Sequence, residues 1–470
     1  MFHAIADKRW LVLGLGDTGL SLARWLSRHG ARVRVADTRD NPPHATRLRR
    51  DFAAVDLVTG SYQPSTFANI DGIAISPGVS VREASIVIAA ATGIPVVGDV
   101  ELFGQALASQ PSRPKVVGIT GSNGKSTVAT MVGEMCRASG LNTVVAGNIG
   151  LPVLDALSEA EEICAAAKPH IYVLELSSFQ LETTSTLALD AASVLNVTED
   201  HLDRYDDMAE YAAAKARIFE HCRHQVLNRD DRYSVAMKMD ASAVSYFGQS
   251  APLGRDHFGL STLRGESWLM HDQSPLLAVA DLPLTGAHNA ANALAALALA
   301  RAIDLPYPPL IEALKRFRGL PHRVEKVMDI GKVGYYDDSK GTNVGATVAA
   351  LNGMKVKVVL IAGGDGKGQD FSPLSDAVAK HARAVILIGR DAKLIEAAIA
   401  ASGVALLHAR SMDEAVKLSW QVSEPGDCVL LSPACASFDM FSNYAHRAQA
   451  FIEAVRALAA ARRSLSEQTL

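Results

Sequence analysis

A glycine-rich segment offers the clearest chemistry in the sequence. Residues 116–127 read Val-Val-Gly-Ile-Thr-Gly-Ser-Asn-Gly-Lys-Ser-Thr, which is an apolar run, a polar turn and the start of a helical pattern. In such a turn the glycines let backbone N–H groups converge on phosphate oxygens, the helix N-terminus favours negative charge, and the lysine reaches the outer phosphates. Ser126 or Thr127 is then placed to hold Mg²⁺. We predict an ATP site formed by Gly121, Ser122, Asn123, Gly124, Lys125, Ser126 and Thr127.

This loop is a variant of the usual phosphate-binding pattern. Ile119 occupies the position where G-x-x-x-x-G-K-[ST] has its first glycine. An ordinary glycine-rich turn is the alternative, but Gly-Lys-Ser-Thr opening an amphipathic helix after an apolar strand favours phosphate. A bound triphosphate does not specify a reaction, because ATP can drive motion, phosphorylate a substrate or activate an acid.

Two further side chains follow apolar runs. Glu175 ends the run 171–175, and His201 follows the run that leads to Asn196. The carboxyl ends of parallel strands meet at one edge of a sheet, so both side chains could ligate Mg²⁺ beside the nucleotide. A structural histidine explains His201 equally well, and spacing alone leaves the metal role open. Lys215, taken by itself, fits a solvent-facing position on a helix.

The N-terminal residues carry a second glycine motif. Gly14-Leu-Gly-Asp-Thr-Gly19 follows an apolar strand and opens a helix, and Asp37 ends the next strand. This arrangement is the dinucleotide-binding fingerprint, so by itself it predicts NAD and an oxidoreductase. Any diphosphate at a helix N-terminus needs the same glycines, and the ATP loop downstream disfavours the oxidoreductase.

Apolar runs that alternate with helical patterns predict an α/β fold with mostly parallel sheets. At roughly 150 residues per domain, the length predicts about three domains. The proline-bracketed stretch 111–114 reads as a linker, since neither proline continues a helix. We expect a Rossmann-like N-terminal domain (1–112), a central P-loop-type ATPase domain (113–320) and a Rossmann-like C-terminal domain (321–470). Strands are expected at 10–13, 32–36, 73–76, 95–97, 115–119, 142–146, 171–176, 193–197, 332–336, 357–362, 384–389, 404–408 and 427–432.

Composition argues against several classes of protein. The 46 Lys and Arg against 50 Asp and Glu give a net charge of -4, without the basic field that nucleic acid attracts. The 5 cysteines include no C-x-x-C pair, which argues against a disulfide framework or a zinc site and fits the cytoplasm. The alanine-rich stretch 290–303 contains Asn292 and Arg301 and is too short for a membrane span, so we expect a buried helix there.

Several segments together resemble the Mur ligases of bacterial peptidoglycan synthesis, over nearly the whole chain. They are Thr120-Gly-Ser-Asn-Gly-Lys-Ser-Thr, Gly147-Asn-Ile-Gly-Leu-Pro, Leu174-Glu-Leu-Ser-Ser-Phe-Gln-Leu-Glu-Thr, Asn196-Val-Thr-Glu-Asp-His, Gly286-Ala-His-Asn, Leu320-Pro-His-Arg, Asp338-Ser-Lys-Gly-Thr-Asn and Leu431-Ser-Pro-Ala-Cys-Ala-Ser-Phe-Asp. The resemblance is closest to the glutamate-adding members, because the last segment matches them and the Asp-Asn-Pro-Arg segment of diaminopimelate-adding members is absent.

The resemblance implies roles for the residues left open above. Glu175, His201 and Ser126 would hold two Mg²⁺ ions together with Lys215, which this family carries as a carbamate. Carbamylation turns the lysine cation into an anion that can ligate a metal. Lys125, His201 and Lys215 are thereby the expected catalytic residues. Further contacts to the nucleotide are expected from Asn292, Arg323, Asp338 and Lys340.

The resemblance also implies where the other substrates bind. The N-terminal domain would take the diphosphate and uracil of UDP-N-acetylmuramoyl-L-alanine in place of NAD, and the C-terminal domain would take glutamate through a cation and hydroxyl donors. The residues expected for the UDP-sugar are Asp17, Thr18, Gly19, Asp37, Thr38, Arg39, Ser76, Gly78 and Asn148. Those expected for glutamate are Thr342, Lys367, Ser437 and Tyr444. Tyr444 stands where the family pattern has phenylalanine, and Gly341 where some relatives have alanine. By itself, Lys367 could equally be a solvated loop lysine.

These roles predict an ATP-dependent ligase of cell wall synthesis, and hence of cell division. The γ-phosphate would pass to the L-alanyl carboxylate, and the amine of D-glutamate would attack the acyl phosphate, leaving ADP and phosphate. Domain closure would keep water from the intermediate. A cytoplasmic monomer is expected. The alternatives are an alanine-adding, diaminopimelate-adding or folylpolyglutamate relative and a non-catalytic nucleotide-binding regulator, and the sequence leaves the hand of the glutamate open.

Overall fold

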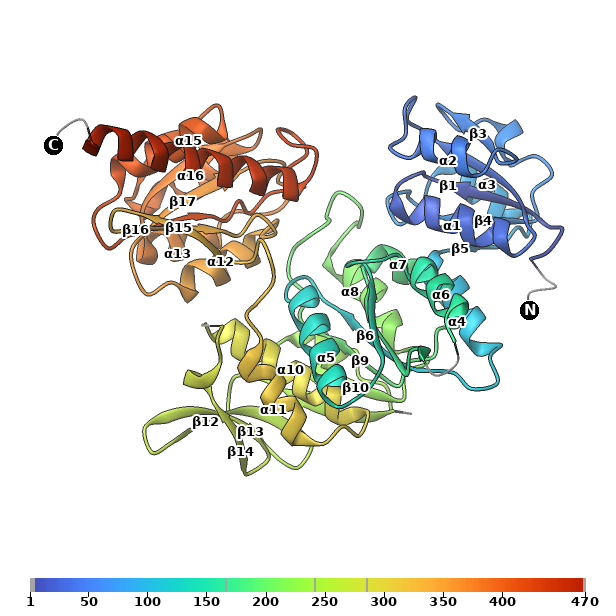
Figure 1. Cartoon of the computed structure of the whole chain (residues 1–470), viewed down its shortest axis with the longest axis horizontal. Helices are drawn as coiled ribbons and strands as arrows, with labels where there is room; N and C mark the ends of the chain where they lie inside the picture. Colours follow the sequence, from blue (N-terminus) through green and yellow to red (C-terminus); the bar gives the residue numbers. More distant parts are fainter. Residues whose placement is uncertain (1–4, 165–166, 241, 285, 468–470) are drawn as a thin grey trace. The chain divides into compact units, whose positions relative to one another are not determined.

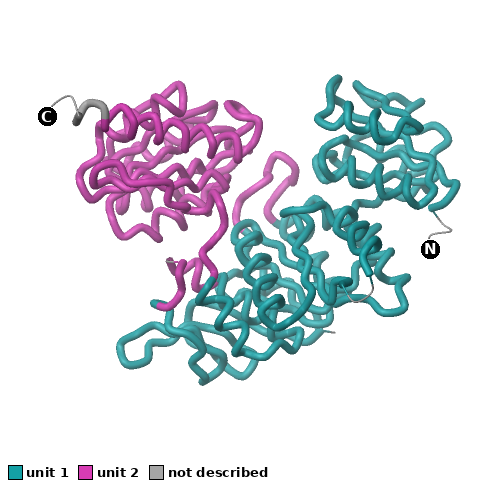
Figure 2. The backbone as a smooth tube through the Cα atoms, in the orientation of Figure 1, with its two compact units in different colours: residues 1–197, 209–280, 292–316 teal, residues 198–208, 281–291, 317–470 magenta. Residues whose placement is uncertain are grey.

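The computed structural model describes residues 5–164, 167–240, 242–284 and 286–467, and the strands of these residues form three sheets (Figure 1). Most neighbouring strands run parallel, which confirms the predicted α/β class. The chain divides into two compact units, shown in Figure 2, one made of residues 1–197, 209–280 and 292–316 and the other of residues 198–208, 281–291 and 317–470.

The first sheet has five parallel strands in the order β3-β2-β1-β4-β5. Leu11 and Leu13 of β1 pack in one apolar cluster with Ile73 and Ile75 of β4, as alternating side chains on one face of a sheet should. Strand β3 was not expected, because its four residues are partly exposed and carry little apolar signal. The elements are β1 Arg9–Leu13, α1 Asp17–Arg28, β2 Arg32–Asp37, α2 Ala45–Asp51, β3 Asp56–Thr59, β4 Gly72–Ile75, α3 Ala84–Ala91, β5 Val96–Val97 and α4 Asp99–Ala108.

The second sheet has nine strands in the order β14-β13-β12-β11-β10-β9-β6-β8-β7. It is parallel from β7 to β12 and ends in two antiparallel pairings, β12 with β13 and β13 with β14. Its elements are β6 Lys115–Thr120, α5 Lys125–Ala138, β7 Thr143–Gly147, α6 Val153–Glu162, β8 Ile171–Glu175, α7 Ser178–Glu182, β9 Ala191–Val194, α8 Met208–Ala216, β10 His224–Asn228, α9 Arg232–Ala236, β11 Ala243–Phe247, β12 His257–Leu263, β13 Glu266–His271, β14 Ser274–Ala278, α10 Ala287–Ala302 and α11 Tyr307–Arg316.

The strands from β10 to β14 were missed by the sequence prediction. The turn between β12 and β13 is Arg264-Gly265, and both residues have positive φ, of 52° and 86°. Such a turn usually carries Asn or Asp before the glycine. Because arginine occupies that position here, the sequence did not indicate a hairpin. The central sheet is therefore mostly parallel, as predicted, with an antiparallel extension that the list of expected strands did not include.

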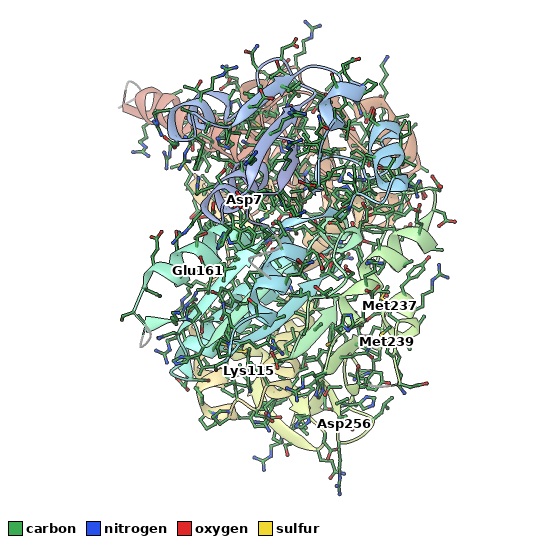
Figure 3. The ribbon with its side chains drawn as sticks, turned by 90° about the vertical axis from the view of Figure 1, so that its right-hand side faces the viewer. Asp7, Lys115, Glu161, Met237, Met239 and Asp256 are labelled. Atoms are coloured by element: carbon green, nitrogen blue, oxygen red, sulfur yellow. The ribbon has the colours of Figure 1, made fainter. Side chains whose placement is uncertain are left out.

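The helices next to the central strands follow the predicted pattern. Val128, Met131, Val132 and Met135 of α5 are all buried, which confirms that they share one face of the helix. The alanine-rich helix α10 is buried along residues 293–300, as predicted. Lys115, labelled in Figure 3, begins β6, and its Nζ donates to the carbonyl of Ile303 at 2.9 Å, so the end of this buried helix region is tied to the start of the strand.

The third sheet has six strands in the order β15-β16-β20-β17-β18-β19, parallel except for β15. In β17 the side chains of Val358 and Leu360 face one apolar cluster, and those of Val359 and Ile361 face another. A strand with both faces buried must be apolar throughout, which is why its sequence was easy to recognise. The elements are β15 Glu325–Ile330, β16 Val333–Asp337, α12 Val344–Gly353, β17 Val358–Gly363, α13 Leu374–His381, β18 Ala382–Ile388, α14 Ala392–Ile399, β19 Ala405–His408, α15 Met412–Val422, β20 Cys428–Leu431 and α16 Tyr444–Glu467.

The predicted domain limits, 1–112, 113–320 and 321–470, stay predictions, and their outer ends at 1 and 470 lie outside the described residues. The first two sheets share one compact unit, while residues 198–208 and 281–291 group with the C-terminal chain. Within the described residues, every helix is too short or too polar to cross a lipid bilayer.

Candidate active site

The loops with the predicted chemistry meet at one edge of the central sheet. Strand β6 lies between β8 and β9, with Ile119 paired to Glu175 and Thr120 paired to Val194. Gly147, at the end of β7, is in turn paired to Glu175. The carboxyl ends of four parallel strands are thus aligned, and the chain order changes direction at β6, which is where open α/β sheets bind their ligands.

The phosphate-binding loop has a backbone that requires its glycines. Gly121 and Gly124 have φ of 146° and 85°, and a Cβ on Gly124 would lie 2.6 Å from Oδ1 of Asn292. Helix α5 begins at Lys125, as predicted, and Ser126 and Thr127 are buried in its first turn. Lys125 Nζ donates to the carbonyls of Gly121 at 2.8 Å and Ser122 at 3.0 Å. The lysine therefore folds over the loop whose N–H groups would receive phosphate.

Asn196 braces this loop and was not among the predicted site residues. Its Oδ1 accepts from the N–H of Asn123 at 2.8 Å, and its Nδ2 donates to the carbonyl of Asn123 at 3.0 Å. Its own carbonyl accepts from the N–H of Ser122 at 2.9 Å. The signal for this role was available, because Asn196 is a polar residue just after a buried strand. Only the pairing of β9 with β6 shows which loop it holds.

Glu175 is buried with one carboxylate oxygen unsatisfied. Oε1 accepts from Nδ2 of Asn148 at 2.7 Å, whereas Oε2 has no hydrogen-bond partner among the described residues. A buried carboxylate oxygen without a donor is costly, and a bound cation removes that cost. The residue therefore fits a Mg²⁺ ligand. Asn148, expected at the UDP-sugar, contacts Glu175 in this structure.

Lys215 is buried beside the same loop. It is 1% exposed, so the solvent-facing position expected from its sequence alone is wrong. Its Nζ donates to the carbonyl of Gly121 at 3.0 Å and lies 4.4 Å from the ring centroid of Tyr211. Gly121 thus accepts from both Lys125 and Lys215. Two cations that share one carbonyl repel each other, and a bound phosphate or an anionic form of Lys215 would relieve that repulsion.

His201 and Lys367 belong to the second compact unit. Asp200 joins them, because its Oδ1 accepts from the N–H of His201 at 3.0 Å and from Nζ of Lys367, and its Oδ2 accepts from Nδ2 of Asn343 at 3.3 Å. The side chain of Lys367 is 12% exposed, so it is not a solvated loop lysine. His201 has φ of 58°, a left-handed conformation that is uncommon outside glycine. Asp200 was not among the predicted site residues. The pairing of Glu175 with His201 as metal ligands stays a prediction.

The loop after β16 holds Asp338 and Lys340, two of the nucleotide residues predicted from the C-terminal chain. Burial raises the pKa of Asp338 to about 7, although its Oδ2 accepts from Oγ of Ser432 at 2.7 Å. Lys340 Nζ lies 5.3 Å from the ring centroid of Tyr444, which brings a predicted nucleotide residue next to a predicted glutamate residue. Ser437 is buried and Thr342 is half-buried.

The neighbouring carboxylate Asp337 is fully buried and has its own partners. Its Oδ2 accepts from Nδ1 of His322 at 2.6 Å, and its Oδ1 accepts from the N–H and Oγ of Ser339. His322, Glu325 and Asp337 lie close enough for one metal ion, with ligand atoms within 4.8 Å of one another. Because both oxygens of Asp337 are already satisfied within the protein, this cluster is accounted for as a structural hydrogen-bond network.

The N-terminal glycine motif has the close packing that its fingerprint predicts. A Cβ on Gly19 would lie 1.8 Å from the carbonyl of Gly14, so only glycine fits there. Burial opposes ionisation of Asp37, but hydrogen bonds from Arg39 and the N–H of Leu15 outweigh burial and lower the pKa of this carboxyl. Oγ of Ser76 donates to the carbonyl of Gly14 at 3.0 Å.

The other residues predicted for the UDP-sugar are more open. Asp17 accepts from Nε2 of His44 at 2.7 Å, and space is open around Gly78. Thr38 follows the buried Asp37 and is exposed. The structure therefore gathers Asp37, Arg39 and Ser76 around the glycine turn.

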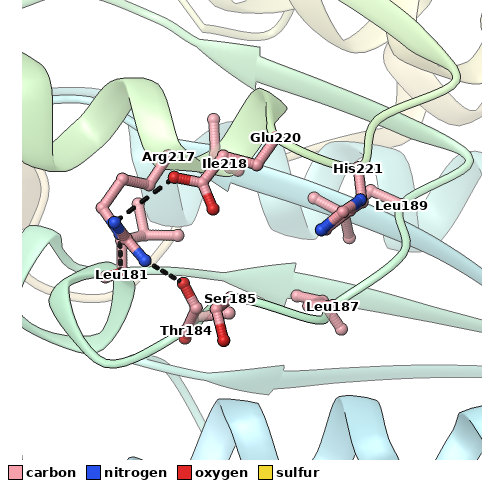
Figure 4. Close-up of a pocket in the computed structure, with 9 residues that line it drawn as sticks. All are labelled: Leu181, Thr184, Ser185, Leu187, Leu189, Arg217, Ile218, Glu220 and His221. Atoms are coloured by element: carbon pink, nitrogen blue, oxygen red, sulfur yellow. Dashed lines mark hydrogen bonds and ion pairs between the residues drawn. The ribbon is translucent and has the colours of Figure 1, made fainter.

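A separate small pocket in the central domain holds none of the predicted site residues (Figure 4). Arg217 lines it, and its Nε and Nη2 donate to the carbonyls of Leu181 at 2.8 Å and Thr184 at 2.6 Å. The guanidinium also pairs with Glu220 at 3.3 Å. Because these neighbours use its donors, the arginine stabilises the fold here and offers no ligand site.

The chain matches three families of Mur ligase domains in succession. Residues 8–98 match the family described as Mur ligase MurD-like, N-terminal domain. Residues 119–300 match the Mur ligase middle domain, and residues 322–435 match the Mur ligase glutamate ligase domain. The three matches follow the order of the three sheets.

Whole proteins and solved structures show the same likeness. The UDP-N-acetylmuramoylalanine–D-glutamate ligase of Thiobacillus denitrificans is 56% identical over 469 residues, covering 97% of this chain and 98% of the relative. The protein of that name from Methylobacillus flagellatus is 55% identical over 451 residues, covering 96% and 97%. The solved UDP-N-acetylmuramate-alanine ligase of Thermotoga maritima shares the fold at 19% identity, with a TM-score of 0.61 over 96% of this chain and 100% of its own. The MurF ligase of Thermotoga maritima, solved in complex with ADP, has a TM-score of 0.60 at 16% identity over 98% and 97%. The chain belongs to the Mur ligase family.

Proposed function

We propose that the protein is an ATP-dependent ligase that joins D-glutamate to UDP-N-acetylmuramoyl-L-alanine through an acyl phosphate, releasing ADP and phosphate. The observation that carries this proposal is its 56% identity, over nearly the whole of both chains, to a relative named for that reaction. The phosphate loop that meets buried Glu175 and Lys215 at one sheet edge supplies the chemistry the reaction needs. The proposal places the enzyme in the synthesis of peptidoglycan precursors.

The reaction must turn a poor electrophile into a good one. In the first step an oxygen of the L-alanyl carboxylate attacks the γ-phosphorus of ATP, and the bond to ADP breaks. Lys125 and the N–H groups of the loop would stabilise the negative charge on the transferring phosphoryl group. In the second step the glutamate amine attacks the acyl carbon, and the tetrahedral intermediate expels phosphate as the amine loses its proton.

Mg²⁺ would be held by Glu175, through the oxygen that lacks a hydrogen-bond partner among the described residues, together with Ser126, His201 and a modified Lys215. When bound, such ions neutralise charge on the phosphates. We assign Lys215 as the carbamylated lysine, because its burial beside Lys125 favours conversion of one of the two cations into an anion. Asn292, Arg323, Asp338 and Lys340 complete the proposed nucleotide site.

The remaining assignments follow the same proposal. Glutamate is taken by Lys367, Thr342, Ser437 and Tyr444, with Asp200 holding the lysine in place. The UDP-sugar is taken at the glycine turn by Asp17, Thr18, Gly19, Asp37, Thr38, Arg39, Ser76 and Gly78, with Asn148 nearer the muramoyl end. A cytoplasmic monomer belongs to the same proposal.

The decisive experiment measures phosphate release from ATP in the presence of UDP-N-acetylmuramoyl-L-alanine and a panel of amino acids of both hands. We expect release with D-glutamate and none with L-glutamate, alanine or diaminopimelate. Activity with alanine or diaminopimelate in place of glutamate would assign the chain to another ligase of the family. Absence of amino-acid-dependent release would favour a nucleotide-binding regulator, and an absorbance titration with NADH and NADPH tests the oxidoreductase alternative.

A further inference from the structure

Arg447 is a buried cation that the proposed reaction does not use. It lies in the first turn of α16 and is 1% exposed. Its Nη1 donates to the carbonyl of Cys435 at 3.0 Å, and its Nη2 donates to the carbonyl of Ser339 at 2.8 Å. Burial lowers the pKa of Arg447 to about 10, so the guanidinium is still charged at neutral pH.

This position is unfavourable for a cation on two counts. The N-terminus of a helix carries partial positive charge, so an arginine in the first turn opposes the helix dipole. Nε of Arg447 is also buried with no hydrogen-bond partner among the described residues. Both features lower the stability of the fold. Residues that lower stability in this way are expected where a side chain contributes to a functional site.

The two carbonyls that Arg447 binds belong to the loops after β16 and β20. These loops also contact each other, because the N–H of Ala434 donates to the carbonyl of Gly341 at 3.0 Å. The first loop carries Asp338, Lys340 and Thr342, and the second carries Ser437. Arg447 therefore lies at the junction between the predicted nucleotide residues and the predicted glutamate residues.

A third loop is attached to the same junction. Asp365 follows β17, and it exchanges two backbone hydrogen bonds with Ala436, at 3.0 and 2.8 Å. This loop leads directly to Lys367. The loops that follow the three neighbouring strands β16, β20 and β17 are thus linked by backbone hydrogen bonds. The guanidinium of Arg447 adds hydrogen bonds to the loops after β16 and β20.

We propose that Arg447 is a positioning residue, whose guanidinium bridges the Ser339 and Cys435 carbonyls and so keeps the nucleotide-binding loop in register with the glutamate-binding loops. The inference rests on the proposed function for the identity of the two ligands. The bridge itself is a property of the fold and can be tested without them.

The test compares Arg447→Lys and Arg447→Met with a control from the same unit. Lysine keeps the charge but has one nitrogen, which cannot span both carbonyls, and methionine keeps only the stem. Arg383 is the control, because it pairs with Asp427 and Glu424 near the opposite ends of the strands, so Arg383→Met removes an arginine contact far from the three loops. Each variant is assayed for kcat, for KM of D-glutamate and ATP, for Tm, and for hydrogen exchange of the ligand-free protein.

We expect both Arg447 variants to lose about 10- to 100-fold in kcat/KM for D-glutamate, the scale at which displacements of about 1 Å affect catalysis. Faster amide exchange at Ala434 and Ala436 should accompany the loss, while Arg383→Met lowers Tm and leaves kcat/KM and amide exchange near wild type.

Arg447→Lys with wild-type kinetics and exchange would overturn the bridge, as would kinetic losses that merely track Tm across all variants. If Arg447→Met does not fold, Arg447→Lys decides. A wild-type enzyme inactive with D-glutamate refutes the proposed function, whereas unchanged exchange in Arg447→Lys refutes the positioning role.

Discussion

The ion pair between Asp200 and Lys367 allows a quantitative test of the C-terminal chain. The two side chains are 8% and 12% exposed, so both charges have lost most of their water. Removing one partner of such a pair leaves the other charge uncompensated and costs about 3–5 kcal/mol. Asp200→Ala should lower the free energy of unfolding of the second compact unit by about that amount. Hydrogen exchange of the buried amides of β17 and β20, which belong to the same unit, followed as a function of urea concentration, measures the loss.

A double-mutant cycle isolates the charge term. Asp200→Ala combined with Lys367→Met leaves no uncompensated charge, so we expect the double variant to recover about 1–3 kcal/mol relative to the sum of the single losses. Asn343→Ala is the uncharged control, because it removes a neutral donor to the same carboxylate together with the N-cap of α12, and it should cost about 2 kcal/mol. Additive losses across the cycle would refute the reasoning that the pair is held by its buried charges. Because Lys367 is proposed to bind glutamate, Asp200→Asn should also raise KM for D-glutamate more than KM for ATP.

Three further predictions concern the central domain and its link to the first sheet. Lys125→Ala should abolish phosphate release while leaving Tm close to wild type, because its ammonium donates to the carbonyls of Gly121 and Ser122 within its own loop; activity above about a tenth of wild type would contradict a role in phosphoryl transfer. Lys215→Ala should lose most of its turnover and regain part of it with added acetate or propionate, and a fully active variant without rescue would refute the carbamate. Burial raises the pKa of Asp99 to about 6 from 3.8, so its stabilising contribution is complete below about pH 4 and is lost as the pH rises through about 6. Asp99→Asn should therefore flatten the fall in Tm over this range and stabilise the protein at pH 7.5 by up to about 3 kcal/mol, and an unchanged pH profile would argue against a neutral buried acid.

The accuracy of the sequence prediction followed how local each signal was. The phosphate loop was recognisable because its glycines and Lys125 are consecutive, and the fold keeps them in one turn at the start of α5. Strand β17 was recognisable because both of its faces are buried. The antiparallel strands β12 to β14 were missed, because half-exposed strands joined by an Arg-Gly turn give neither a continuous apolar run nor the usual turn residues.

The site residues divide in the same way. Glu175 was expected at the carboxyl end of a strand from its sequence alone, but its unsatisfied Oε2 depends on which neighbours β8 has in the sheet. Asp200 and Asn196 were passed over, because their partners lie 167 and 73 residues away along the chain. No local pattern encodes such a pairing.

The sequence by itself determined the α/β class, the phosphate loop and the residue types able to activate a carboxylate, because these depend on hydrophobic periodicity and on short motifs. Tertiary structure alone decided that Lys215 is buried against Gly121, that Asp200 holds Lys367, and that Arg447 spans two loops. The physical reason is that the burial of a polar side chain and the identity of its partner depend on which strand ends the sheet order brings together.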